Sequence, residues 1–278
     1  MSGRVKGKVA FITGIARGQG RAHALRLVDE GAAGIIGLDL CDAIEGVEIY
    51  PPSTLDDLQT TINLVEEAGG KIIAEQGDVR NSSDLKRVLD KGIATFGRLD
   101  IVCANAGILT VAPALEQGPE QWQSMMDINV TGVWNTCREA IPHLIDNGGG
   151  SVIITSSTAG TKGNANTLSY NVSKHGVVGM MRTLANELGR YNIRVNTVHP
   201  TSVDTPMVMN EKVYGLFDPA NPNPTRESAE VTFATTHVLS VAVIEPHDVS
   251  EAVLWLGSDE SRYVTGALLP IDAGFVIR

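Results

Sequence analysis

The chain has 278 residues, of which 43% are hydrophobic, and this length suits one α/β domain better than two. Its formal net charge of −10 argues against a nucleic-acid partner, because a face that binds phosphates needs clustered Lys and Arg. No apolar run reaches the roughly 18 residues that a membrane-spanning helix requires, so we expect no membrane span.

Strand-like and helix-like patterns alternate along the chain. Apolar runs typical of buried strands lie at residues 9–12, 35–38, 71–74, 99–104, 151–155 and 193–198, with a closing strand pattern at 264–272. Amphipathic helical patterns lie between them, at 54–68, 82–96, 120–146 and 168–190. Such alternation implies right-handed crossovers. It predicts a single α/β domain, residues 1–278, in which a doubly wound parallel sheet carries helices on both faces.

Cysteine usage and the first residues bear on the compartment. Cys41, Cys103 and Cys137 are odd in number and scattered, so neither a disulfide framework nor a zinc site fits them. Residues 1–8 are basic but lack the long apolar stretch of a signal peptide. A reducing cytoplasm is therefore the compartment that we expect.

A glycine-rich turn follows the first predicted strand. It reads Thr-Gly-Ile-Ala-Arg-Gly-Gln-Gly from Thr13 to Gly20, and a helical pattern follows it. Gly14 permits the tight turn, Gly18 lets the backbone approach a pyrophosphate, and Gly20 allows the helix to pack closely on the strand. The helix N-terminus then offers free N–H groups and a partial positive charge to phosphates. Strand, glycine turn and helix together predict a dinucleotide site.

The second predicted strand ends in an acid that bears on the choice of dinucleotide. Asp39 lies about 20 residues beyond Gly20, the separation expected for a carboxylate that grips the adenosine ribose. It favours NAD, because it would face the 2′-phosphate of NADP as a like charge. Arg17, inside the glycine turn, supports the opposite choice, since an arginine there can meet a 2′-phosphate.

Ser157, Tyr170 and Lys174 form a candidate device for moving a proton to or from a carbinol oxygen. Positions four residues apart share one helix face, so the Lys174 ammonium can lie beside the Tyr170 phenol. A phenol titrates near pH 10 in water, and a nearby cation favours the phenolate. Ser157, thirteen residues before the tyrosine, supplies a neutral donor that can hold the substrate oxygen.

These motifs, with the run Asn105-Ala106-Gly107, resemble the short-chain dehydrogenase/reductase family over nearly the whole chain. The resemblance implies a Rossmann-type fold, a homotetramer, and NAD-dependent interconversion of a secondary alcohol and a ketone by hydride transfer. It makes Tyr170 the general acid/base. Lys174 would lower the pKa of that phenol and hold the nicotinamide ribose, Ser157 would orient the reacting oxygen, and Asn129 would hold a proton-relay water.

The family also implies where the cofactor binds. Asp78 and Val79 match the position near the adenine, and residues 200–207 match the stretch that meets the nicotinamide carboxamide, although the usual Pro-Gly is Pro200-Thr201 in this chain. The full set of implied cofactor residues is Gly14, Arg17, Gly18, Gln19, Gly20, Asp39, Leu40, Asp78, Val79, Asn105, Ala106, Gly107, Tyr170, Lys174, Pro200, Val203 and Thr205.

Two other functions remain open. One is an NADP-dependent carbonyl reductase, supported by Arg17 and opposed by Asp39. The other is a catalytically silent, dinucleotide-binding regulatory protein. The intact Ser157, Tyr170 and Lys174 oppose this second alternative, because a relative without catalysis would be expected to lose at least one of them.

An insertion at residues 40–54 narrows the resemblance. Its Leu-Cys-Asp start and Ile-Tyr-Pro end are similar to an actinobacterial subfamily associated with the peptide-derived redox cofactor mycofactocin, whose members are often labelled carveol dehydrogenases. The resemblance implies a small apolar alcohol or ketone as substrate, a nicotinamide that stays bound, and an external redox partner. The alternative is a surface loop that serves only oligomer contacts.

The irregular stretch 199–230, with its five prolines, predicts a long loop at the ligand-binding edge of the sheet. Its apolar residues either line a substrate pocket, together with residues 108–118, or pack a lid against the body. For His143, His175 and His199 we expect surface or packing roles, because none has a metal-ligand partner at a suitable spacing.

Overall fold

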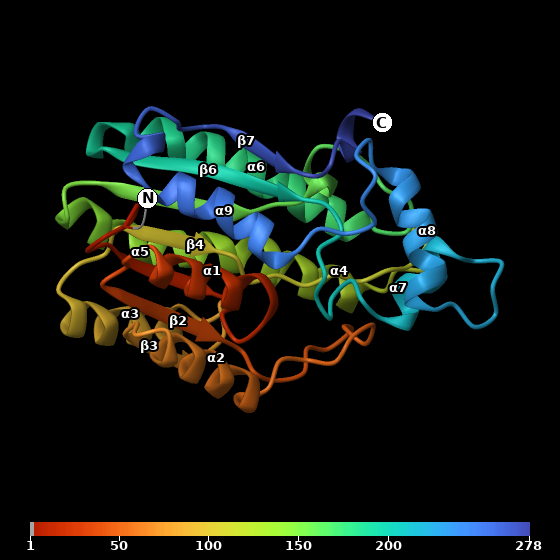
Figure 1. Cartoon of the computed structure of the whole chain (residues 1–278), viewed down its shortest axis with the longest axis horizontal. Helices are drawn as coiled ribbons and strands as arrows, with labels where there is room; N and C mark the ends of the chain where they lie inside the picture. The colour runs from red at the N-terminus through yellow and green to blue at the C-terminus, as the bar shows by residue number, and fades with distance from the viewer. Residues whose placement is uncertain (1–2) are drawn as a thin grey trace.

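The structure is a computed structural model, and it describes residues 3–278. Met1 and Ser2, the start of the basic N-terminal segment, lie outside the described residues. Seven parallel strands form one sheet in the order β3-β2-β1-β4-β5-β6-β7 (Figure 1). They are β1 (Val9–Thr13), β2 (Gly34–Asp39), β3 (Ile72–Gln76), β4 (Ile101–Ala104), β5 (Gly150–Thr155), β6 (Ile193–Pro200) and β7 (Leu268–Ile271). The predicted doubly wound parallel sheet is confirmed.

Helices cover both faces of this sheet (Figure 1). On one face lie α1 (Gly18–Asp29), α2 (Leu55–Glu67) and α9 (Pro246–Gly257). On the other face lie α3 (Ser82–Phe96), α4 (Pro119–Met126), α5 (Val133–Asp146) and α6 (Leu168–Leu188). Short 3₁₀ turns are η2 (Thr158–Gly160), η3 (Gly189–Tyr191), η4 (Asp259–Ser261) and η5 (Phe275–Ile277). Each face of the sheet thus has its own apolar core.

Local sequence explains why these elements form. Every residue of β1 and β2 is buried, as a parallel sheet covered on both faces requires. Helix α2 begins at a capping box, in which the Thr54 hydroxyl accepts the Asp57 N–H at 3.1 Å and the Asp57 carboxylate accepts the Thr54 N–H at 3.0 Å. Helix α3 ends at Gly97, whose φ of +77° is open to glycine without strain.

The topology determines where a ligand can bind. β1 pairs with β2 on one side and with β4 on the other, so the strand order reverses at this point. In open α/β sheets, ligands bind in the crevice beyond the carboxyl ends of the strands at such a reversal. The glycine turn follows β1, and the run 105–107 follows β4. Both candidate cofactor segments therefore meet at one end of the sheet.

Two predicted stretches differ from the structure. The helical pattern at 120–146 divides into α4, the π-helical turn η1 (Asp127–Gly132) and α5. The expected loop 199–230 contains α7 (Glu211–Phe217) and the first residues of α8 (Arg226–Thr236). Both helices are capped, because Asn210 accepts the Val213 N–H and Thr225 accepts the Ser228 N–H. Caps allow helices to form between the prolines of this segment.

The insertion 40–54, which we call the strap, leaves β2 and runs toward α7 (Figure 1). The Ser124 hydroxyl of α4 donates to the Glu45 carbonyl at 3.1 Å, and the Lys212 ammonium of α7 donates to the Glu48 carbonyl at 2.8 Å. Ile49 packs into a small apolar cluster with Val213 of α7 and Phe233 of α8. The strap therefore connects the sheet to the lid formed by α7 and α8. Among residues 3–278, no helix is both long and apolar enough to cross a membrane.

Candidate active site

Two adjoining cavities open at the carboxyl ends of the strands. The first, the cofactor cavity, lies between the glycine turn, the end of β2 and the strap. The second, the substrate cavity, measures about 520 Å³ and lies between the end of β5, α6 and the lid. Both are lined by Gln19, Asn105, Gly107, Ile108, Thr205 and Met207. Because they share a wall, a ligand that fills the first can present one end to the second.

The structure brings the predicted site residues together around this double cavity. The cofactor cavity is lined by Gly14, Arg17, Gly18, Gln19, Gly20, Asp39, Leu40, Asp78, Val79, Asn105, Ala106, Gly107 and Thr205. The substrate cavity is lined by Ser157, Tyr170, Lys174, Pro200 and Val203. Asn129 lines neither cavity. It is fully buried next to the loop that follows β4.

The glycine turn is packed against the loop after β4. Gly14 has a φ of +72°, and a Cβ there would lie 2.9 Å from the Ala106 Cα. A Cβ on Gly20 would lie 2.0 Å from the Gly14 carbonyl oxygen. The Asn105 side chain donates to the Thr13 carbonyl at 3.1 Å, which ties the two segments together. These contacts require glycine at both positions and keep the helix N-terminus close to the cavity.

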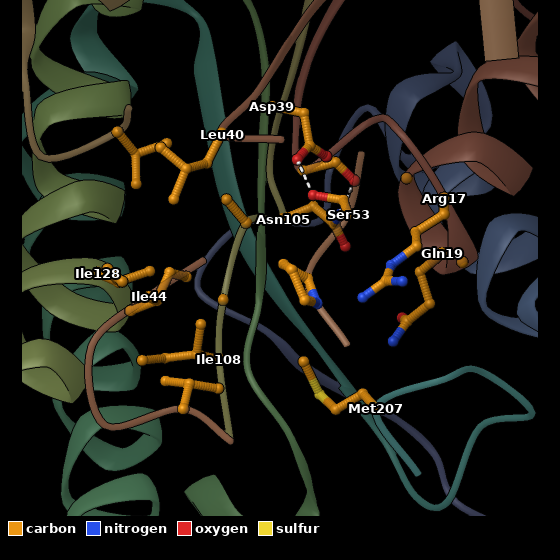
Figure 2. Close-up of a pocket in the computed structure, with 18 of the residues that line it drawn as sticks. Arg17, Gln19, Asp39, Leu40, Ile44, Ser53, Asn105, Ile108, Ile128 and Met207 are labelled. Carbon is orange, nitrogen blue, oxygen red and sulfur yellow. Dashed lines mark hydrogen bonds between the residues drawn. The ribbon is translucent and has the colours of Figure 1, made fainter. Parts of the chain in front are cut away.

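Asp39 is held in place at the end of β2. Its carboxylate accepts the Ala16 N–H at 2.8 Å and the Ser53 hydroxyl at 2.7 Å, the second bond coming from the strap. Figure 2 shows this pair across the cavity from Arg17. The Arg17 guanidinium donates to the Pro51 carbonyl of the strap. Arg17, the residue that supported an NADP site, is therefore already bonded to the strap. Asp39, the carboxylate that disfavours NADP, is fixed in place.

Gln19 carries an unsatisfied polar atom at the junction of the two cavities. Its side chain points into the cofactor cavity, opposite the apolar wall of Leu40, Ile44 and Ile128 (Figure 2). Its Oε1 is buried without a hydrogen-bond partner among the described residues. A buried polar atom left in this way calls for a ligand or water. The cavity therefore offers groups that suit each part of NAD. The Asp39 carboxylate suits the adenosine ribose, the N-terminus of α1 suits the pyrophosphate, and the Gln19 amide suits the nicotinamide.

The three candidate catalytic residues converge in the wall of the substrate cavity. The Lys174 ammonium donates to the Thr155 carbonyl at 2.8 Å and lies 5.6 Å from the centroid of the Tyr170 ring. The Ser157 hydroxyl accepts the Ala159 N–H at 3.1 Å, which leaves its proton available to a substrate oxygen. The candidate acid/base tyrosine, the cation and the neutral donor thus line one cavity.

Burial shapes the electrostatics of this site. Burial raises the pKa of the Tyr170 phenol above its ordinary value, and the hydrogen bond with Ser157 opposes the rise. Burial also lowers the pKa of Lys174 to about 8, so the ammonium still carries its charge at neutral pH. The expected lowering of the tyrosine pKa by Lys174 stays a prediction, because burial is the dominant influence on the phenol in this structure.

Asn129 lies in the π-helical turn η1, where one extra residue per turn re-aims a side chain. Its Oδ1 accepts the Ile108 N–H at 2.8 Å, and its Nδ2 donates to the Ile108 carbonyl at 2.9 Å. The same Nδ2 lies 3.2 Å from the Ser173 hydroxyl. The amide therefore anchors the loop that follows β4. Its predicted role in holding a proton-relay water stays a prediction.

Sequence reasoning associated the insertion that contains Tyr50 with a retained cofactor, and it missed two other residues that reach the site. Tyr50 of the strap lines the cofactor cavity, and its hydroxyl accepts the Leu109 N–H at 3.2 Å. Phe275, near the C-terminus, lines the substrate cavity. His199, expected to be a packing residue, lies 2.7 Å from the Ser157 carbonyl through its Nδ1. Only His199 had a signal in the sequence, since it ends a buried strand directly before Pro200.

Comparison with known proteins agrees with this geometry. Residues 14–276 match a family model described as enoyl-(acyl carrier protein) reductase. A (−)-trans-carveol dehydrogenase of Rhodococcus erythropolis is 47% identical over 99% of both chains. A crystal structure of carveol dehydrogenase from Mycobacterium avium in complex with NAD is 48% identical, with a TM-score of 0.97 over 100% of both chains. That of a short chain dehydrogenase from Mycobacterium paratuberculosis bound to NAD is 43% identical, with a TM-score of 0.91, covering 99% of this chain and 100% of that one.

Fold and cleft together define a dinucleotide-binding α/β protein with an acid/base site for an alcohol or carbonyl group. The chain belongs to the short-chain dehydrogenase/reductase family. The predicted activity, NAD-dependent interconversion of a secondary alcohol and a ketone, is confirmed.

Proposed function

We propose that the protein oxidises a small apolar secondary alcohol of the carveol type to its ketone, or reduces the ketone, with Tyr170 as the general acid/base. The observation that carries this proposal is the convergence of Tyr170, Lys174 and Ser157 in the wall that faces the cofactor cavity. When bound, NAD would supply a hydride acceptor at its nicotinamide, and the residues shared by the two cavities, such as Gln19 and Asn105, would hold it beside the substrate cavity.

The chain's own residues move the proton. In the oxidation direction, the Tyr170 phenolate oxygen takes the proton of the substrate hydroxyl, while the Ser157 hydroxyl donates to the same substrate oxygen. Burial opposes formation of the phenolate, so the nearby Lys174 ammonium must offset it once Ser157 donates to the substrate. A placed acid/base of this kind typically contributes about 10²–10⁴ in rate. Asn129 would support a water through which the proton leaves.

The substrate class follows from the lining of the substrate cavity. Its walls away from the catalytic residues are mainly apolar and come from the loop after β4, the lid and the C-terminal turn: Val111, Met207, Val208, Val213, Leu216, Phe217 and Phe275. At about 520 Å³, the cavity is within the usual size range for small-molecule sites. A compact terpenoid alcohol suits it, in agreement with the names of the two carveol dehydrogenase relatives.

The strap supports a further part of the proposal, that the nicotinamide cofactor is retained between turnovers. Tyr50, Ser53 and Ile44 of the strap line the cofactor cavity, and its contacts with α4 and α7 hold it in place. A strap stiffened by Pro51 and Pro52 can cover a ligand at low ordering cost. A retained cofactor would need an external redox partner, similar to mycofactocin, to reoxidise it in place.

We also propose that the protein forms a homotetramer and acts in the cytoplasm. Exposed apolar side chains support the assembly: Trp134 of α5, and Leu168 and Val172 of α6, are each about two-fifths exposed or slightly more. These helices build the tetramer in the family that the sequence resembles. Large apolar side chains left exposed on these helices favour a protein–protein contact there.

Two experiments test the proposed function. The purified protein is desalted extensively and denatured, and the released small molecules are identified by mass spectrometry. About one NAD per chain supports retention, whereas substoichiometric NAD with ordinary multiple turnovers on added NAD would exclude it.

Separately, nicotinamide absorbance is followed with carveol and a panel of acyclic and charged secondary alcohols. Turnover of charged alcohols in preference to carveol would refute the substrate class.

A further inference from the structure

His199 lies at the end of β6, 1% exposed, between two polar atoms. Its Nδ1 is 2.7 Å from the Ser157 carbonyl oxygen, and its Nε2 is 2.8 Å from the Thr197 hydroxyl oxygen. Thr197 and His199 are two residues apart on one strand, so their side chains point to the same face of the sheet. The ring thus connects a buried strand hydroxyl with the backbone of a candidate catalytic residue.

These two contacts determine the tautomer of the ring. A carbonyl oxygen can only accept, so Nδ1 must carry the proton that it donates to Ser157. In the neutral ring Nε2 is then an acceptor, and the Thr197 hydroxyl donates to it. Burial lowers the pKa of His199 below its ordinary value, which agrees with a neutral ring. The Ser157 carbonyl therefore fixes the tautomer, and the Thr197 hydroxyl satisfies the ring nitrogen that is left without a proton.

The position of Ser157 explains why such support is useful. The last backbone bond between β5 and β6 is donated by the Ser156 N–H to the Val198 carbonyl, so Ser157 lies just beyond the paired part of the sheet. Its carbonyl accepts the Gly160 N–H at 2.9 Å and the His199 Nδ1–H, which occupies both lone pairs. The Ser157 hydroxyl belongs to the same residue as this carbonyl. A shift of the Ser157 backbone would therefore move the hydroxyl that is expected to donate to the substrate oxygen.

We propose that His199 is a positioning residue for the reaction, and that it acts by fixing the backbone of Ser157 while the Thr197 hydroxyl holds its second ring nitrogen. The inference rests on the proposed role of Ser157 as the donor to the substrate oxygen. A packing role alone would not require this residue. A leucine would fill similar space, whereas a buried imidazole is tolerated only when its nitrogens have partners.

The first test compares His199→Asn with His199→Leu. Both side chains branch at Cγ and differ chiefly in the amide, whose Nδ2 can take the place of Nδ1. A misplacement of about 1 Å at a reacting group can cost about 10²-fold in rate. We expect His199→Leu to lower kcat by roughly 10- to 100-fold, with the Kd for NAD unchanged by calorimetry, and His199→Asn to stay near wild type.

A double-mutant cycle that combines His199→Leu with Ser157→Ala separates an effect of His199 through Ser157 from effects that do not involve Ser157. Without the serine hydroxyl there is nothing to position, so His199→Leu should change the residual kcat little in that background. Equal losses in both backgrounds would overturn the inference. Ser157→Ala alone tests the proposed function: if it kept full activity, the role assigned to Ser157 would fail, whatever the result at His199.

Thr197→Val provides the second variant, should His199→Leu fail to fold. It preserves side-chain shape and removes the hydroxyl that bonds to Nε2 of His199. We expect a several-fold lower kcat with an unchanged Kd for NAD, and no further loss when Thr197→Val is combined with His199→Asn, because asparagine has no Nε2 for the hydroxyl to hold. An unchanged kcat in Thr197→Val would overturn the role proposed for Thr197. The same loss of kcat in the His199→Asn background would overturn it as well.

Discussion

Replacing Tyr50 by phenylalanine should loosen the strap over the cofactor. The Tyr50 hydroxyl accepts the Leu109 N–H at 3.2 Å, and this bond joins the middle of the strap to the loop after β4. Burial raises the pKa of Tyr50 to about 12, so the hydroxyl stays protonated at any working pH. Phenylalanine keeps the ring and its packing. The substitution therefore removes one hydrogen bond and leaves the remaining contacts of the strap in place.

The size of the effect follows from the Leu109 N–H that loses its partner. An unsatisfied buried donor costs about 1–3 kcal/mol, and the lower part of that range applies because this bond is only partly buried. When the strap opens, water can satisfy the N–H, so the cost falls on the closed state. A penalty of about 1–2 kcal/mol then corresponds to roughly 5- to 30-fold faster release of the nucleotide.

Stopped-flow fluorescence measures this release directly. The protein is loaded with NADH and mixed with excess NAD, and the loss of bound-nicotinamide fluorescence gives the dissociation rate. Tyr263→Phe serves as the matched control, because Tyr263 is 90% exposed and lies far along the chain from the strap. If Tyr50→Phe and Tyr263→Phe released NADH at the same rate, the hydroxyl would not hold the strap and the reasoning would be refuted.

Three further outcomes are expected. Tyr170→Phe should keep the fold and NAD affinity, measured by thermal unfolding and calorimetry, but lose nearly all turnover; a tenth or more of wild-type activity would contradict the acid/base role. NAD should bind far more tightly than NADP in titration calorimetry, because the fixed Asp39 carboxylate faces the 2′-phosphate as a like charge, and equal affinities would contradict this. Lys174→Met should stabilise nucleotide-free protein at pH 7 while abolishing activity. The lysine pKa falls from 10.5 to about 8 on folding, so the charged amine costs about 3 kcal/mol, offset by about 1 kcal/mol for its bond to Thr155. Between about pH 8 and pH 10.5, the unfolded chain binds more protons at Lys174 than the folded chain, so the stability of the wild type rises with pH in this range. Urea unfolding at pH 7 and pH 10 should therefore show that the difference in stability between Lys174→Met and wild type becomes smaller at the higher pH.

The centre of the sheet could be predicted from sequence because its strands, unlike the edge strands β3 and β7, are buried on both faces. β1 and β2 therefore appear as uninterrupted apolar runs, which no surface element imitates. Helices α7 and α8 could not be predicted in the same way. α7 has seven residues and only one of them, Val213, is buried, so it shows no helical periodicity. Its order comes from packing against α8, the next helix along the chain, and against the strap, which is distant in sequence.

The residues of the candidate site divide in the same way, into those placed by the strand ends, which the sequence predicts, and those placed by long-range packing, which it does not. Gly14, Asp39 and Ser157 follow the carboxyl ends of strands, and a parallel sheet brings those ends together whatever the intervening chain does. Tyr50 and Phe275 reach the cavities from the strap and the C-terminal turn. Their positions depend on long-range contacts, such as the Lys162 ammonium that donates to the Phe275 carbonyl at 3.3 Å. Local pattern contains no record of such contacts, so Phe275 was not predicted, and Tyr50 was predicted only as part of the strap.

The strap and the lid share one apolar cluster, and this has a consequence for how cofactor and substrate reach the site. Ile49 of the strap packs with Val213 and Phe217, two lid residues that also line the substrate cavity. Lifting the strap to release the nucleotide would expose this cluster and break the bond from Lys212 to the Glu48 carbonyl. Opening the lid for substrate would break the same strap–lid contacts, but it can leave untouched the Ser53–Asp39 bond that holds the strap at the end of β2. Substrate exchange therefore breaks fewer contacts than nucleotide release, and this difference is what the proposed retention of the nucleotide requires.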